Sequence, residues 1–213
     1  MKLSELIRIQ ETLRKKIEPV YSGNNVQFVA GCDVAYTHEN SIACVVVMKM
    51  SEMSIVETSF HKEKTRFPYI PGFLAFREAN AIARAIAKIK TTVDVFILDG
   101  HGIAHPRRMG LATHAGILVD RPTIGCAKSL LAGTYRMPGK EKGDFSTVII
   151  DNEVVGICLR TKKGAKPVFV SPGNHMDIEN SIKIVLQCTA NYKTPEPLRL
   201  AHIFANRKKN MEA

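Results

Sequence analysis

Two aspartates occupy positions where a carboxylate is costly unless it binds something. Asp33 lies within the apolar run FVAGCDVAY, and Asp99 directly follows the apolar run VFIL. A carboxylate in such a strand is expensive unless it is paired or bound to a metal. Gly31 and Ala35, on the same face as Asp33, are small and leave room for an approaching group. The plainer interpretation is that Asp33 faces solvent and that Asp99 caps a turn with Gly100.

A third carboxylate, Glu78, falls on the apolar side of a helix predicted over residues 71–90. At 100° per residue, Glu78 lies about 40° from Leu74 and from Ile82, which belong to the apolar stripe. A buried glutamate needs a partner, although a side chain at the edge of the stripe would also reach solvent. Three carboxylates from a strand, a helix and a later strand suggest one site for Mg²⁺, with Mn²⁺ as a substitute. The sequence has no HExxH motif and no Cys/His cluster, so zinc is not expected.

The charge of the chain favours a polyanionic partner. Its net charge is +10 and its pI is about 9.5, and nucleic acid is the commonest partner of so basic a protein. A basic but merely solvated surface is the alternative. Basic charge together with carboxylate-bound Mg²⁺ points to phosphodiester hydrolysis. Lys128 follows a short apolar run and could contact the scissile phosphate, or it could be an ordinary surface lysine.

The elements that must position these residues form an α/β pattern. Short turns predict an antiparallel meander of three strands at the start of the sheet. The crossover rule makes the run 93–98 parallel to an earlier strand, and if that strand is 26–36, Asp33 and Asp99 lie on adjacent strands. We predict one domain over residues 1–213 with a mixed sheet flanked by helices. The expected strands are 26–36, 42–50, 54–62, 93–98, 123–126, 145–150, 154–160 and 168–170, and the expected helices are 4–16, 71–90, 112–119, 177–188 and 198–208.

Cysteine usage and hydropathy predict a cytoplasmic protein that does not associate with membranes. The five cysteines form no CxxC pair and lie mostly in apolar runs, which fits a reducing compartment. The first residues read as an amphipathic helix and not as a signal peptide. No apolar run approaches the ~20 residues that span a bilayer.

Six segments, in order and over nearly the whole chain, resemble the endonuclease V family. They are AGCD from Ala30, PYIPGFLAFRE from Pro68, DGHGIAHPR from Asp99, DRPTIGCAKSLL from Asp120, FVSPG from Phe169 and PEPLRLAH from Pro195. The resemblance implies a ribonuclease-H-like fold and the nicking of DNA that contains deoxyinosine. Cleavage would fall at the second phosphodiester bond on the 3′ side of the lesion and leave 3′-hydroxyl and 5′-phosphate ends.

The resemblance also implies roles for individual residues. Asp33 and Asp99 match the metal-binding aspartates of the family, and Glu78 matches its third acidic residue. Lys128 matches a catalytic lysine, and His202 matches a position that completes the site.

The same comparison implies a lesion wedge beside a pocket for the flipped base. A proline-stiffened tip that carries an aromatic ring suits the gap left by an extruded base, since unstacking costs a few kcal/mol. Small residues let backbone groups reach the edge of the base. The wedge positions are Pro68, Tyr69, Ile70 and Pro71, and the pocket positions are Gly72, Leu74, Gly100, His105, Gly110, Ala127 and Leu131.

Two departures and two alternatives remain at this point. Asn174 stands where the family often has histidine and His175 follows it, so neither is assigned to catalysis. His101 replaces a residue that is frequently glutamine.

The expected partner is deoxyinosine-containing DNA bound by a monomer. One alternative is an inosine-specific endoribonuclease that acts on RNA. The other is a nucleic-acid-binding protein that does not cut. The retained acidic residues argue against this second alternative, because carboxylates that served no purpose would repel phosphate.

Overall fold

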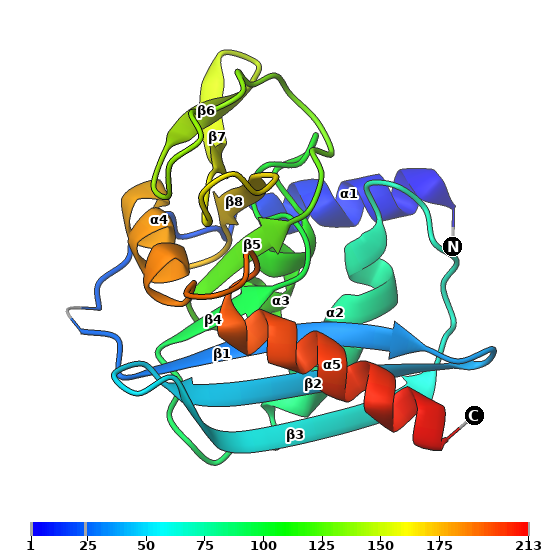
Figure 1. Cartoon of the computed structure of the whole chain (residues 1–213). Coiled ribbons are helices and arrows are strands. Elements are labelled where there is room, and N and C mark those ends of the chain that lie inside the picture. Colours follow the sequence, from blue (N-terminus) through cyan, green and yellow to red (C-terminus); the bar gives the residue numbers. More distant parts are fainter. Residues whose placement is uncertain (1, 24, 213) are drawn as a thin grey trace.

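A mixed sheet of eight strands forms the centre of the molecule in the computed structural model, which describes residues 2–23 and 25–212. The strand order is β3-β2-β1-β4-β5-β8-β7-β6 (Figure 1). The first three strands form the predicted antiparallel meander, and β4 and β5 run parallel to β1. The bounds are β1 (Phe28–Tyr36), β2 (Asn40–Lys49), β3 (Ser54–Lys64), β4 (Val95–Leu98), β5 (Thr123–Ala127), β6 (Phe145–Ile150), β7 (Glu153–Leu159) and β8 (Val168–Pro172).

Helices cover both faces of this sheet, and α5 crosses in front of β1 and β2 while α2 lies behind (Figure 1). One apolar core joins the sheet to α4 and α5, and a second joins the opposite face to α2 and α3. This arrangement confirms the predicted α/β class and the ribonuclease-H-like mixed sheet. In the described part of the chain, no helix combines the length and the apolar character needed to cross a membrane. The helices are α1 (Leu3–Arg14), α2 (Leu74–Ile86), α3 (Leu111–Val119), α4 (Ile178–Gln187) and α5 (Glu196–Met211).

The helix predicted over residues 71–90 is shorter than expected at both ends. Helix α2 begins at Leu74 and ends at Ile86. The residues before it form a turn in which the Phe73 amide donates to the Ile70 carbonyl at 2.9 Å. Gly72 has a φ of 80°, a left-handed conformation that favours glycine and cannot continue a helix. Pro71 therefore belongs to the turn before the helix and not to its first turn.

Candidate active site

The two aspartates lie side by side at one edge of the sheet. Cys32 of β1 pairs with Leu98 of β4 in parallel register, so the residues that follow them, Asp33 and Asp99, are adjacent. The Asp99 amide also donates to the Cys32 carbonyl at 3.3 Å. The prediction that the run 93–98 is parallel to an earlier strand is confirmed, and the structure identifies that strand as β1, as the hypothesis placed it.

Helix α5 brings His202 to this pair across the face of β1. The space that Gly31 leaves is filled by the start of α5, because a Cβ on Gly31 would lie 2.1 Å from the Pro197 carbonyl carbon. One face of the helix is buried there through Leu198, Ala201 and other small or apolar residues. The small residue beside Asp33 thus admits a helix of the same chain.

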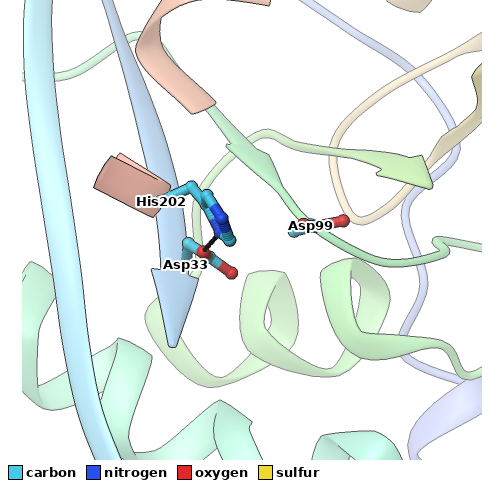
Figure 2. A group of neighbouring side chains, drawn as sticks. All are labelled: Asp33, Asp99 and His202. Carbon is cyan, nitrogen blue, oxygen red and sulfur yellow. Dashed lines mark hydrogen bonds and ion pairs between the residues drawn. The ribbon is translucent and has the colours of Figure 1, made fainter. Parts of the chain in front are cut away.

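The three side chains form a cluster that could hold a metal ion. His202 Nδ1 lies 2.6 Å from Asp33 Oδ2 (Figure 2). One ligand atom from each of Asp33, Asp99 and His202 lies within 4.8 Å of the others. Two of the three donors are carboxylates, which suit a hard cation such as Mg²⁺ or Mn²⁺. The residues present therefore fit the metal that the sequence suggested.

The electrostatics of the cluster also favour a bound cation. Burial and the neighbouring Asp99 carboxylate raise the pKa of Asp33, and the hydrogen bond with His202 opposes this rise. Lys128 Nζ lies 2.6 Å from Asp99 Oδ2. Burial lowers the pKa of Lys128, but the hydrogen bond to Asp99 and the charges of Asp99 and Asp33 together outweigh burial and raise the pKa overall. A divalent cation would relieve the repulsion between the two carboxylates.

Glu78 approaches from the opposite face of the sheet, on α2, and lies outside the three-residue cluster. It is buried, and the Tyr36 hydroxyl donates to its Oε1 at 2.6 Å. Burial raises the pKa of Glu78 to about 8; the Tyr36 hydrogen bond opposes this, and the Asp33 and Asp99 charges add to it. The partner that a buried glutamate requires is therefore Tyr36. The sequence did contain a signal for this partner. Tyr36 carries a hydroxyl and lies on the face of β1 that points toward α2.

We expect the raised pKa of Glu78 to make stability depend on pH. The folded pKa, about 8, exceeds the ordinary value of 4.5, so its stabilising contribution is complete below pH 4.5 and is lost as pH rises toward 8. Between pH 6.5 and pH 8, the free energy of unfolding should fall by about 2 kcal/mol without divalent metal. Glu78→Gln should flatten this dependence, whereas Glu11→Gln, an exposed control, should leave it intact. Urea unfolding at both pH values measures the effect, and an unchanged slope in Glu78→Gln would contradict it.

A pocket of about 510 Å³ opens beside the cluster, and Asp99 and Lys128 belong to its wall. All seven predicted pocket positions line it, and so do Tyr69 and Pro71 of the predicted wedge, whereas Pro68 and Ile70 do not. The Tyr69 side chain projects into solvent, 65% exposed. The pocket wall also contains residues that the sequence did not single out for it, which are Ala75, His101, Met109, Leu111, Ser129 and Leu130.

His105 belongs to the pocket wall, and its ring is hydrogen-bonded to the chain itself. Its Nδ1 accepts from the Arg107 amide at 3.1 Å, so its Nε2 carries the proton and donates to the Gly72 carbonyl at 2.9 Å. Burial lowers the pKa of His105 to about 4, which keeps the ring neutral. Both ring nitrogens are thus engaged by the chain itself, and His105 shapes the pocket by holding Gly72.

The unassigned pair Asn174 and His175 binds the segment that follows α1. Asn174 Oδ1 accepts from the Glu18 amide at 3.0 Å. His175 lies between the carboxylates of Glu18 and Asp120, at 3.0 and 2.8 Å. These contacts give both residues structural partners. His101 Nε2 lies 3.0 Å from the Ser129 carbonyl oxygen, so it links the loop after β4 to the loop after β5.

Comparison with known proteins agrees with this arrangement. The sequence model of the Endonuclease V family matches residues 11–203. Endonuclease V of Dictyoglomus thermophilum is 42% identical over 208 residues, which cover 98% of this chain and 91% of that protein. The crystal structure of Bacillus subtilis endonuclease V is 33% identical, with a TM-score of 0.94, and the match covers 100% of this chain and 94% of that one. Ciona intestinalis endonuclease V, crystallised with a 24mer DNA containing an inosine followed by a ribo-adenosine, is 32% identical with a TM-score of 0.89 over 99% of this chain and 98% of that one. The chain therefore belongs to the endonuclease V family of nucleases.

Proposed function

We propose that this protein is a Mg²⁺-dependent endonuclease that nicks DNA containing deoxyinosine, the product of adenine deamination, and so starts its repair. Cleavage falls at the second phosphodiester bond 3′ to the lesion and leaves 3′-hydroxyl and 5′-phosphate ends. The protein acts in the cytoplasm as a monomer with one domain over residues 1–213. The observation that carries this proposal is that Asp99 belongs both to the carboxylate cluster and to the wall of the pocket, where Lys128 is paired with it.

The pocket has the size and lining expected for a flipped base. Its volume of about 510 Å³ lies in the range of small-molecule sites, which span roughly 300–1,000 Å³. Gly100 and Gly110 in its wall let the surrounding loops pack closely, since a Cβ on Gly110 would lie 2.2 Å from the His101 carbonyl oxygen and one on Gly100 would lie 3.2 Å from Leu111 Cβ. A base in this pocket would place its own strand across the carboxylate cluster. The Ciona intestinalis relative was crystallised with inosine-containing DNA, which supports hypoxanthine as that base.

Each residue of the cluster, and each of its neighbours Lys128 and Glu78, has a separate task in this proposal. Asp33 and Asp99 hold the Mg²⁺ ion, which when bound supplies an activated water and neutralises charge on the phosphate. Lys128 holds a positive charge at the edge of the pocket, where it stabilises the charge that develops on the scissile phosphate. His202 orients the Asp33 carboxylate through the 2.6 Å contact. Glu78, protonated against Tyr36, limits the negative charge beside the site.

A cleavage panel tests the proposal directly. Wild-type protein should nick deoxyinosine duplex DNA with Mg²⁺, should not nick undamaged duplex, and should lose activity with EDTA. Matched inosine RNA belongs in the panel because the Ciona intestinalis complex contains a ribo-adenosine directly after the inosine. Faster cleavage of the RNA would favour the endoribonuclease alternative. Binding of every strand without nicking would favour a protein that only binds nucleic acid.

We expect Tyr69→Ala to weaken lesion recognition selectively. Tyr69 is exposed, so the change should leave stability almost unaltered. Loss of the ring that fills the gap should weaken binding to deoxyinosine duplex about tenfold, with undamaged duplex within about twofold. Fluorescence anisotropy with both duplexes measures this. Tyr192→Ala, at another exposed tyrosine, is the control, and equal losses on both duplexes would exclude a wedge role for Tyr69.

A further inference from the structure

Gln10 is a buried polar residue on a helix that otherwise faces mainly solvent. Helix α1 lies outside the layers that cover the sheet, beside the chain that leads into α2 (Figure 1). Of its twelve residues, Leu6 and Gln10 are buried, and Gln10 is fully buried at 0% exposure. A buried amide is costly unless its hydrogen bonds are made. The partners of Gln10 therefore show what α1 is built to hold.

The Gln10 amide joins the turn before α2 to the loop before α3. Its Nε2 donates to the Gly72 carbonyl at 3.1 Å and to the Met109 carbonyl at 3.2 Å. Its Oε1 accepts from Arg107 Nε at 2.5 Å. Carbonyls only accept and a guanidinium only donates, so these partners determine the orientation of the amide. A carboxylate or an apolar side chain could not replace it.

The Gly72 carbonyl is the point at which this network converges. Besides Gln10, it accepts from His105 Nε2 and from Arg107 Nη2, each at 2.9 Å. Gly72 directly follows residues 68–71, the tip that carries Tyr69. Gly72 and Tyr69 both belong to the pocket wall. A side chain on Gly72 would be strained at its φ of 80° and would lie 3.2 Å from Arg107 Nη2. The turn is thus held against the loop that forms the other wall of the pocket.

We propose that Gln10, supported by α1, is the positioning residue that holds the tip carrying Tyr69 at a fixed place beside the base pocket. This inference rests on the proposed function, because it assigns Gln10 to lesion recognition by that site. The side-chain hydrogen bonds of Gln10 go to Gly72, Met109 and Arg107 and not to the carboxylate cluster or to Tyr69, so Gln10 acts through its partners. A recognition element that must fill the gap left by an extruded base works only within a fraction of an ångström of its place. Loss of the amide should therefore reduce lesion discrimination more than it reduces the chemical step.

Comparing Gln10→Met with Leu6→Val tests this assignment on the full-length protein. Both changes alter a buried residue of α1, but only the first removes the donors to Gly72 and Met109. We expect Gln10→Met to weaken binding to deoxyinosine duplex and to raise KM about tenfold, with undamaged-duplex binding within about twofold and kcat within about threefold. When wild-type protein binds a duplex with 2-aminopurine beside the deoxyinosine, unstacking should raise the fluorescence, and Gln10→Met should abolish most of this rise. Leu6→Val should match wild type in these measurements, and Gln10→Asn, which keeps a shorter amide, replaces Gln10→Met if that variant does not fold.

The outcomes separate the inference from the function on which it rests. A selective loss in the Gln10 variant alone supports the inference. Wild-type behaviour of Gln10→Met, equal losses on both duplexes, or the same loss in Leu6→Val would overturn it and leave the proposed function standing. If wild-type protein itself did not prefer or nick deoxyinosine duplex, the proposed function would fail first, and the inference would fail with it.

Discussion

Asp99→Asn should reduce nicking of deoxyinosine DNA by roughly 10³-fold or more, which corresponds to about 4 kcal/mol of lost transition-state stabilisation. The substitution keeps the shape of the side chain but removes one of the two carboxylates in the cluster. It also removes the ion pair that holds Lys128 Nζ at 2.6 Å. Both the metal affinity and the placement of the lysine should therefore suffer. Single-turnover cleavage with a Mg²⁺ titration measures the loss.

The effect of Asp99→Asn should fall on chemistry and not on recognition. The walls of the pocket are otherwise unchanged, so binding to deoxyinosine duplex in Ca²⁺ or EDTA should stay within a few fold of wild type. Asp120→Asn is a matched control, because this side chain is 88% exposed and asparagine tolerates its left-handed backbone. An Asp99→Asn variant that cut as fast as wild type would exclude the proposed metal site.

Gly31→Ala should lower the free energy of unfolding by about 3 kcal/mol and should disable the site in the protein that remains folded. The added Cβ would lie 2.1 to 2.3 Å from backbone atoms of Pro197 and Leu198. A backbone cannot yield as a flexible side chain can, so α5 must move away from β1. That movement uncovers part of the core and separates His202 from Asp33. Because the chain has no tryptophan, circular dichroism in urea is a suitable probe of unfolding.

A second glycine separates the clash from the general cost of adding a methyl group. Gly164 has a φ of 70°, and a Cβ there would meet nothing within 4 Å. Gly164→Ala should cost only about 1 kcal/mol from backbone strain and should retain full activity. If Gly31→Ala were as mild as Gly164→Ala, close packing of α5 on β1 would not be what positions His202.

Several features of the fold followed from local patterns in the sequence. The short turns predicted the antiparallel meander, and the crossover rule predicted that β4 is parallel to an earlier strand, which is β1. The apolar stripe placed Glu78 on a buried face, which is confirmed. The predicted start of α2 at residue 71 was wrong, because a proline is favoured both in the first turn of a helix and in the turn before a helix. The φ of Gly72, which no periodicity reveals, decides between them.

The site itself combines both kinds of information. The sequence by itself determined which residues are chemically out of place, since a carboxylate in an apolar run is costly wherever the chain goes. Only the tertiary structure decided which of them meet. His202 and Asp33 are 169 positions apart, and the network of Gln10 reaches 62 positions to Gly72 and 99 to Met109. Contacts over such separations depend on the packing of α5 into the space at Gly31 and of α1 onto the loops around the pocket. Neither the type of a side chain nor the periodicity of the apolar residues reveals that packing.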